Sequence, residues 1–497
     1  MHVQHNLPLG SVFLASEKMN GGDIDMALLP VGGAGIQGAS TEQSSGQDGR
    51  KKNEFAHGGQ ITKPGREWFC NAEFDLTLPR SFRQAQRPVG VGTLTQPPDV
   101  VDALRRPVTE RARGELVESV EVTGRLLNVA REMAWQLWPA LAKGDRLLVP
   151  SVPPKDYLEY LTSLGFDLPE FSTKSDTNYV FTPFGWNQEA ADLNQLHKHP
   201  AEHPDLSVVA QVNSREFSLQ LEAELFPESV GNPPLKGREG WGAIFCRTSE
   251  ELTRWLEKAS SGRWVAKGNH GHAGIGQLRF SLPEEAGEIQ VKLDRILEAQ
   301  GGLALEPEHK IVVEFGCLFL LSQEGSILAS RCHRLLSFSG GGFAGALWLP
   351  SDPEFLKWQS VIEKSMETLA ARLHREGYFG PVSVDAYAWQ DSDAIRFRPL
   401  VDLNARCSMA YPAHGLSRKF PDKAILISQT PSSVPLPKNL TELRNRLGDL
   451  HFDPATKRGV FLITPLMPGP RRHAFAFIGN DEAEVKVMQQ KTLQALA

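Results

Sequence analysis

The sequence predicts a mixed α/β protein with more than one domain, and three observations support this prediction. The chain has 497 residues, more than one ordinary hydrophobic core holds, so two to four domains are expected. A short apolar run followed by a helix-forming run at 146–164 is typical of an α/β layer. Two β-rich runs on either side of a turn at 390–393 predict an antiparallel hairpin.

Composition argues against several functional classes. Hydrophobic residues make up 41% of the chain and charged residues 23%, and a net charge of −6 without a dense Lys/Arg stripe argues against nucleic-acid binding. The five cysteines are scattered, which argues against a disulfide framework or a zinc site and for a reducing compartment. No apolar run reaches the ~18 residues of a membrane-spanning helix, and no secretory signal is recognised. We therefore expect a cytoplasmic protein that binds neither membranes nor nucleic acid.

The first 65 residues are expected to be disordered, because Gly, Ser, Gln and other polar residues dominate from residue 20 onward. Residues 33–38 formally match the G-x-G-x-x-G dinucleotide fingerprint. However, 39–46 is a poor helix opening and no βαβ unit follows, so we expect no nucleotide site there.

A folded α/β domain is expected from 66 to 205. Residues 110–141 place apolar side chains mostly three and four apart, which predicts a helix with one buried face. A strand at 146–150 and a helix at 157–164 follow. The aromatic segment 181–186 is interpreted as a packed loop, with a substrate pocket as the alternative.

The predicted hairpin carries a set of oxygen-bearing side chains. Alternation along a strand places Asp385, Asp402 and Asn404 on one face. A turn centred between residues 392 and 393 sets Asp385 opposite Leu400, with Asp402 as its diagonal neighbour. Two carboxylates and an amide oxygen suit magnesium that arrives with nucleotide phosphates. The alternative is a hairpin without metal, since strands often end in Asp and Asn where a turn begins.

Lys267 ends a short predicted strand and precedes a loop, 268–276, with four glycines. Without a Cβ in the way, backbone N–H groups near Gly271 and Gly274 can approach phosphate oxygens closely. The lysine adds a positive charge at the mouth of the loop. A flexible hairpin tip is the alternative interpretation.

A buried strand at 310–314 runs into a glycine-containing link at 315–317 and a second apolar run at 318–321. This order predicts a hinge between two lobes. Its backbone, at Phe315, is predicted to pair with an adenine edge, and Glu314 to reach an amino group or a ribose.

The order of these parts, from the lysine and its glycine loop to the hairpin ending Val-Asp-Leu-Asn-Ala-Arg at 401–406, resembles the ATP-grasp superfamily. The resemblance covers residues 206–430, and the stretch before 208 is similar to the domain that precedes ATP-grasp in some peptide and amide ligases. It implies two α+β lobes that clamp a nucleotide. The predicted segments are 1–65 (disordered), 66–205 (preceding α/β domain), 206–430 (ATP-grasp domain, with a nucleotide lid lobe at about 240–318 and a metal-binding lobe at about 319–430) and 431–497 (C-terminal extension).

The resemblance also implies roles for single residues. Lys267 would contact nucleotide phosphates beneath a lid at 268–276, and Glu314 would lie at the adenine hinge. Arg406 would stabilise the transferring phosphoryl group or an acyl phosphate. Arg215 stands roughly where many members have another phosphate-binding lysine. The implied magnesium ligands are Asp385, Asp402 and Asn404, with Asp402 standing where many members have Glu.

The function expected from this resemblance is that of an ATP-dependent carboxylate–amine ligase that uses ATP and Mg²⁺ on a small acid and a small amine, such as an amino acid or peptide. Two alternatives remain open at this point. One is a small-molecule kinase on the same scaffold, and the other is a nucleotide-binding module without catalysis.

Overall fold

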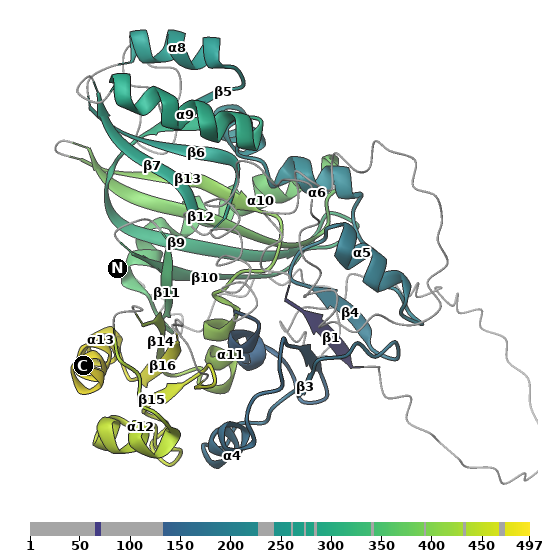
Figure 1. Cartoon of the computed structure of the whole chain (residues 1–497), viewed down its shortest axis with the longest axis vertical. Helices are drawn as coiled ribbons and strands as arrows, with labels where there is room; N and C mark the ends of the chain where they lie inside the picture. Colours follow the sequence, from purple (N-terminus) through teal and green to yellow (C-terminus); the bar gives the residue numbers. More distant parts are fainter. Residues whose placement is uncertain are drawn as a thin grey trace, which may run out of the picture.

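The computed structural model describes residues 65–70, 133–226, 243–259, 262–272, 275–282, 286–338, 342–391, 394–430, 434–466 and 473–497. Within these residues, three β-sheets are flanked by helices (Figure 1), so the predicted α/β class is confirmed. The predictions for 1–64, including the fingerprint at 33–38, lie outside the described residues. So does most of the predicted helix at 110–141.

The N-terminal sheet is parallel, in the order β3-β2-β1-β4. Asp145 links the starts of the two inner strands, because its carboxylate accepts hydrogen bonds from the backbone and guanidinium of Arg66. The predicted packing of 181–186 is confirmed by buried Phe181, Phe184 and Trp186, but residues 181–183 belong to a strand and only 184–186 lie in a loop. The elements of this N-terminal part of the chain are β1 (Arg66–Phe69), the 3-10 helix η1 (Ala134–Ala140), β2 (Arg146–Leu148), α4 (Lys155–Ser163), β3 (Glu170–Ser172), β4 (Val180–Pro183), α5 (Gln188–Gln195), α6 (Leu206–Val212) and α7 (Arg215–Leu225).

A smaller antiparallel sheet forms the upper lobe in Figure 1, in the order β5-β8-β6-β7. Its strands are β5 (Ile244–Cys246), β6 (Gly262–His272), β7 (Ile275–Leu282) and β8 (Leu303–Pro307). Helices α8 (Ser249–Lys258) and α9 (Ala286–Gln300) cover one face and share a separate core with it. Strands β6 and β7 extend into the predicted glycine loop, so only its tip, 273–274, lies outside the described residues.

The large sheet has eight strands in the order β13-β12-β9-β10-β11-β14-β16-β15. Two strands near the C-terminus extend this sheet, and a terminal helix follows them. Its elements are β9 (Lys310–Leu321), β10 (Ile327–Ser337), β11 (Phe343–Trp348), α10 (Pro353–Arg375), β12 (Gly380–Asp391), β13 (Ala394–Asn404), α11 (Tyr411–Lys419), β14 (Ala424–Gln429), α12 (Leu440–Leu447), the 3-10 turn η2 (Gly448–Leu450), β15 (Gly459–Leu462), β16 (Ala474–Gly479) and α13 (Glu482–Leu496).

The predicted hairpin is confirmed, but its register changes partway along. Near the turn, Gln390 pairs with Ile395, as a turn centred between 392 and 393 requires. Beyond a bulge between Asp385 and Tyr387, Asp385 pairs with Asp402 and not with the predicted Leu400. The bulge contains Pro399, which has no N–H to donate to the sheet and therefore favours an interruption of the pairing. Since the shift is two residues, the predicted face is unchanged.

The predicted hinge break at 315–317 is wrong, because β9 runs unbroken through Gly316. The glycine serves close packing. A Cβ at Gly316 would lie 2.4 Å from Nε2 of His333 on the neighbouring strand. The ring of His333 thus occupies the space where a side chain on β9 would project.

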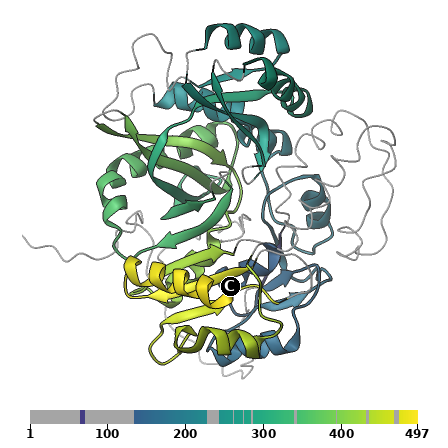
Figure 2. The same ribbon diagram turned by 60° about the vertical axis from the view of Figure 1, so that its left-hand side comes forward.

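Two further cores hold the large sheet. One lies between α10 and strands β9, β12 and β13. The other joins β14, β15 and β16 to η1 and α4, so the C-terminal strands and the N-terminal domain lie side by side (Figure 2). The indole of Trp138 donates to the Ile463 carbonyl at 3.0 Å across this junction.

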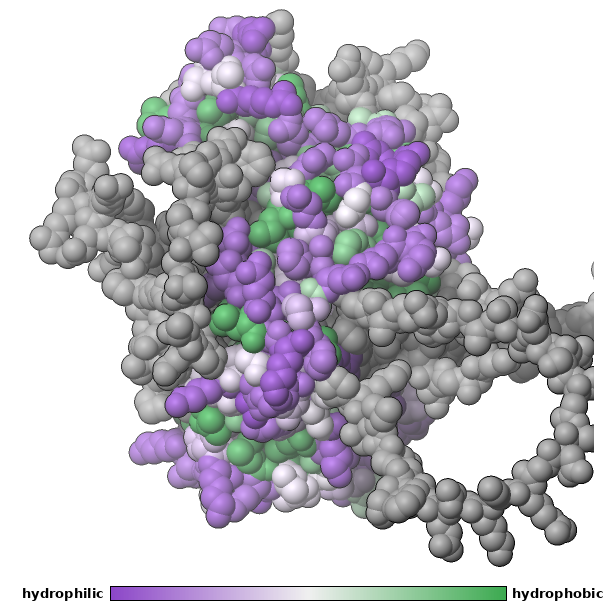
Figure 3. All heavy atoms as spheres, turned by 90° about the vertical axis from the view of Figure 1, so that its right-hand side faces the viewer, coloured by the Kyte–Doolittle hydropathy of each residue, from purple (hydrophilic) through white to green (hydrophobic). Residues whose placement is uncertain are grey.

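The surface in Figure 3 is mostly hydrophilic over the described residues, with small, separated apolar areas. In the part of the chain that the structure describes, none of the helices combines the length and apolar character needed to span a membrane.

Gly415→Ala should destabilise the protein by about 1–3 kcal/mol, because a Cβ on α11 would lie 2.0 Å from the Pro139 carbonyl oxygen of η1. The sign of the change in the free energy of unfolding is informative, since a Gly to Ala substitution within an unobstructed helix stabilises the protein by about 0.5–1 kcal/mol. Urea unfolding followed by fluorescence would measure the change. Lys491→Ala, on the exposed side of α13, is the control and should change stability by less than about 0.5 kcal/mol. A more stable Gly415→Ala variant would contradict this packing.

Candidate functional site

The candidate site lies on the face of the large sheet that is turned away from α10. Cross-strand pairing joins Asp402 of β13 to Asp385 of β12, Asp385 to Gly316 of β9, and Gly316 to His333 of β10. Residues paired in this way share a face, so they form one row across the sheet. The neighbouring residue Val384 belongs to the core on the other face, next to α10.

Lys267 reaches this row from the small sheet. Its Nζ lies 3.1 Å from Oε1 of Glu306 and 3.9 Å from Oδ1 of Asp402. The lysine is buried, and burial lowers its pKa to about 8, an effect that the ion pair with Glu306 offsets only in part. Lys267 therefore points from one lobe to a carboxylate of the other.

Arg215 brings a second cation to the same carboxylate. It is the first residue of α7, which begins where the Ser214 hydroxyl accepts from the backbone N–H of Phe217. Its guanidinium forms an ion pair with Asp402. Arg215 and Lys267 thus both face Asp402, as expected for residues that would share an anionic ligand.

A network of buried ion pairs fixes the position of Lys267. The guanidinium of Arg398 on β13 donates two hydrogen bonds of 2.6 Å to Glu222 of α7 and one of 2.6 Å to Glu306 of β8. Burial alone would lower the pKa of Arg398, but the two carboxylates outweigh it and raise this pKa well above its usual value. Burial opposes ionisation of Glu306 as well, yet Lys267 and Arg398 hold its pKa below the usual range. Glu306 therefore stays ionised and holds Lys267 in place.

Asp385 lies in a less favourable electrostatic environment. Burial, followed by the charge of Glu314, raises its pKa to about 6, although Arg406 and Lys267 act in the opposite direction. Burial also raises the pKa of Glu314, whose carboxylate accepts a 2.8 Å hydrogen bond from Ser337. Two carboxylates thus lie close together where ionisation is costly, and a bound cation would relieve that cost.

Asn404 and Arg406 contact each other at the end of β13. Nη2 of Arg406 donates to Oδ1 of Asn404 at 3.0 Å, and Nη1 donates to the Cys407 carbonyl at 3.1 Å. The guanidinium also lies over the ring of Phe184, 5.5 Å from its centroid. The packed loop of the N-terminal domain therefore holds Arg406 at the edge of the site.

The remaining predicted site residues lie differently. Gly271 is in β6, close to the hairpin tip, and Gly274 is outside the described residues. The Phe315 side chain is fully buried in the core on the opposite face, against Phe355 and Phe397. The backbone of Phe315 lies between β12 and β10 in the sheet, where the predicted contact with adenine would have to compete with strand pairing.

The metal prediction can be tested against the donors present. No group of three or more His, Cys, Asp or Glu side chains is gathered for a metal ion among the described residues. Asp385 and Asp402, paired on neighbouring strands, and the amide of Asn404 two residues further are hard oxygen donors of the kind that Mg²⁺ prefers. These residues fit magnesium when nucleotide phosphates complete the coordination.

Sequence reasoning missed Glu222, Glu306 and Arg398. Glu306 was detectable in principle, because it is a single charged residue within the apolar strand β8. Its partner Arg398 is 92 residues away in the sequence. No local spacing connects the two.

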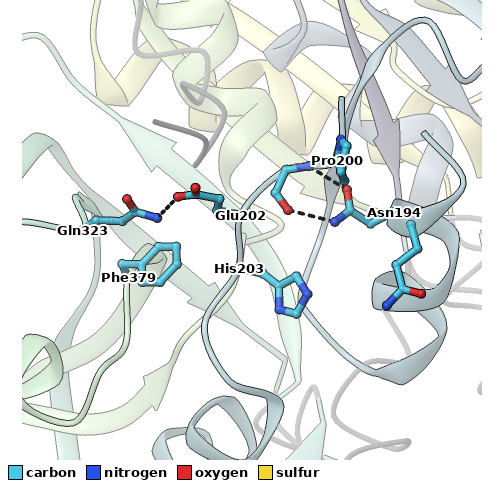
Figure 4. Close-up of a pocket in the computed structure, with 8 residues that line it drawn as sticks. Asn194, Pro200, Glu202, His203, Gln323 and Phe379 are labelled. Carbon is cyan, nitrogen blue, oxygen red and sulfur yellow. Dashed lines mark hydrogen bonds between the residues drawn. The ribbon is translucent and has the colours of Figure 1, made fainter. Parts of the chain in front are cut away.

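A shallow pocket of about 460 Å³ lies elsewhere, at the far end of β9. Figure 4 shows its lining, with Glu202 facing Gln323 and with Asn194 bonded to the backbone of Ala201. It contains none of the candidate site residues, and its only charged side chain among those described, Glu202, is paired with Gln323. The candidate site is therefore the row around Asp385 and not this pocket.

Arg398→Met should destabilise the protein by about 3–5 kcal/mol, because it leaves Glu222 and Glu306 buried without their shared cation. Adding Glu222→Gln removes one of these charges and should restore part of the loss. Thermal unfolding would measure both effects. The matched control is Arg396→Met on the same strand, whose ion pair with Asp391 is partly exposed and should contribute less than about 1 kcal/mol. Equal losses in the two arginine variants would contradict the proposed importance of the network.

His333→Gln should reduce the acid sensitivity of folding. Burial lowers the pKa of His333 to about 3, while the unfolded chain takes up a proton near pH 6.5. Stability from this group is thus present above pH 6.5 and is lost as pH falls toward 3, by about 2 kcal/mol between pH 7 and 5.

In the variant, the loss of unfolding free energy between pH 7 and 5 should be smaller by about this amount, as measured by urea unfolding at each pH. The neighbours of His333, namely His414, which contacts its ring, and Arg331, on the same face of β10, are the same in both proteins. His199→Gln, at an exposed position, is the control. An unchanged pH dependence in His333→Gln would contradict the assignment.

No protein-family model and no curated protein matches the chain. Solved structures do match. The ADP complex of N5-carboxyaminoimidazole ribonucleotide synthetase is 12% identical, covering 74% of this chain and 94% of its own, with a TM-score of 0.45. The same enzyme from Thermus thermophilus is 13% identical over 74% and 96%, with a TM-score of 0.44.

The biotin carboxylase domain of 2-oxoglutarate carboxylase from Hydrogenobacter thermophilus, bound to MgADP, ADP and bicarbonate, is 11% identical over 65% of this chain and 73% of its own, with a TM-score of 0.40. At this identity and these TM-scores the likeness is one of general arrangement.

Proposed function

We propose that the chain is an ATP-dependent carboxylate–amine ligase that forms an amide or peptide-like bond through an acyl phosphate. The observation that carries the proposal is the meeting of Lys267, from the small sheet, with the Asp402–Asp385 pair of the large sheet. Cations from one lobe and carboxylates from the other are what a clamp for a metal–nucleotide complex requires.

The chemistry follows from the weakness of a carboxylate as an electrophile. Transfer of the γ-phosphoryl group of ATP to the carboxylate oxygen gives an acyl phosphate and ADP. Attack of an amine on the acyl carbon then forms the C–N bond and expels inorganic phosphate. The protein has to position the reactants and neutralise charge on the phosphoryl oxygens.

Each site residue has a role in this scheme. Lys267 and Arg215 would bind phosphate oxygens, and Arg406 would stabilise the transferring phosphoryl group beside Asn404. Asp385, Asp402 and Asn404 would hold magnesium, which would supply further positive charge to the phosphates when bound. The partly charged state of Lys267 at alkaline pH, set by its pKa of about 8, would make phosphate binding weaken above that pH.

Lys267→Ala and Asn404→Ala should fold normally but lose turnover by at least about 100-fold, since each removes a group that stabilises the phosphoryl oxygens or their metal. Turnover would be measured as ADP and phosphate released from ATP and magnesium with pools of candidate acids and amines. Lys357→Ala, on the exposed side of α10, is the matched control and should retain activity. Unchanged activity in both site variants would remove these assignments.

The products distinguish the proposal from its alternatives. Release of AMP, or no turnover across a broad panel, would count against a ligase. A product heavier by one phosphate, formed without an amine, would indicate the kinase. ATP binding by calorimetry that survives Asp385→Ala and Asp402→Ala without any turnover would indicate a non-catalytic module.

A further inference from the structure

Four basic side chains that the proposed reaction does not use converge beside the candidate site. Arg331 and His333 are two residues apart on β10 and therefore share a face. His414 and Arg418 are four residues apart on α11 and share a face of that helix.

The two histidines join these faces. Nε2 of His414 lies 3.0 Å from Nδ1 of His333, and the ring centroids are 4.9 Å apart at 75°. Both rings are buried. Because the two histidines are in contact, Arg331 on β10 and Arg418 on α11 project toward the same part of the molecule. Arg418 is further held by a 2.9 Å hydrogen bond from Nη2 to the Ala140 carbonyl of η1.

The arrangement is electrostatically costly. Burial, and then the charge of Arg418, lowers the pKa of Arg331. Burial is also the main cause of the lowered pKa of His414, followed by His333 and the two arginines. Guanidinium groups do not lose their protons at ordinary pH. Two partly buried guanidinium groups therefore lie close enough to interact, and an anion bound between them would be attracted by both.

The cluster lies on the same face as the reaction site. His333 belongs to the row of Asp385, with only the missing side chain of Gly316 between them. Arg331 belongs to the adjacent row, in which it pairs with Leu318, Leu318 with Ser383, and Ser383 with Asn404. Three strand spacings of about 4.8 Å place Arg331 roughly 14 Å from Asn404. A small metabolite or dipeptide spans such a distance.

We infer that Arg331 and Arg418 form a binding site for an anionic group, a carboxylate or a phosphate, on one of the two small-molecule substrates. The planar forks of two arginines match both groups. The neutral imidazoles of His333 and His414 would supply hydrogen bonds without further charge. The inference rests on the proposed function for the identity of the ligand as a substrate, and it narrows the substrate class to molecules with an anionic group remote from the reacting centre.

Calorimetric titration of the full chain with inorganic phosphate and with succinate, at constant ionic strength, tests the site. Wild type should bind at least one of them saturably below about 10 mM. Arg331→Gln and Arg418→Gln should each weaken binding at least about tenfold, since each removes charge-assisted hydrogen bonds. Arg375→Gln, exposed on α10, is the matched control and should bind like wild type. Tighter binding of succinate or of phosphate identifies which anionic group the site prefers.

A titration of the same variants with ATP and magnesium separates this inference from the proposed function. Arg331→Gln should bind ATP like wild type, and Lys267→Ala should still bind the anion. If wild type binds the anion through the two arginines but does not bind ATP, the anion site stands and the ligase proposal fails. Affinity for both anions that is unchanged in Arg331→Gln and Arg418→Gln, anion binding that depends only on Lys267, or no saturable binding to wild type would overturn the site.

Discussion

A continuous set of alternating buried charges connects the three parts of the molecule that meet at the candidate site. Arg398 from the large sheet contacts Glu222 of α7 and Glu306 of the small sheet, and Glu306 contacts Lys267. None of these side chains would be stable alone in so dry a position, since each uncompensated charge would cost several kcal/mol. Each is compensated by a neighbour of opposite charge, and the full set forms only when the two lobes and α7 are correctly assembled. The interactions that hold the lobes together therefore also orient the lysine.

The same constraint explains the uneven electrostatics of the site. Glu306, which lies beside both Lys267 and Arg398, remains ionised, whereas Asp385, beside Glu314 and lacking so close a cation, has a raised pKa. In the candidate site, the carboxylate on the side of the small sheet is thus balanced by cations, whereas the carboxylates near β12 lack positive charge. A bound metal cation would supply charge of the missing sign.

The sequence predicted the α/β class, the hairpin and the shared face of Asp385, Asp402 and Asn404, because these follow from local patterns of period two and from turn residues. It failed where distant segments decide the outcome. The bulge at Pro399 made Asp402 the direct partner of Asp385, and the packing of His333 made Gly316 a close contact within a continuous strand instead of a hinge. Neither the Arg398 network nor the pair of His333 with His414 has a local signal, since each joins residues more than 80 positions apart.

The bulge in β13 has a consequence for how this strand can vary. Relative to a regular hairpin, the bulge adds two residues between Arg398 and Asp402. Because side chains alternate with period two, Arg398 and the residues after the bulge remain on the faces that a regular hairpin would give them. Inserting or deleting one residue there would turn the carboxylate of Asp402 and the amide of Asn404 into the hydrophobic core next to α10. It would also turn Leu403 to the face of the candidate site. Related chains should therefore gain or lose residues in this segment in pairs, and an odd change should coincide with loss of the whole acidic row.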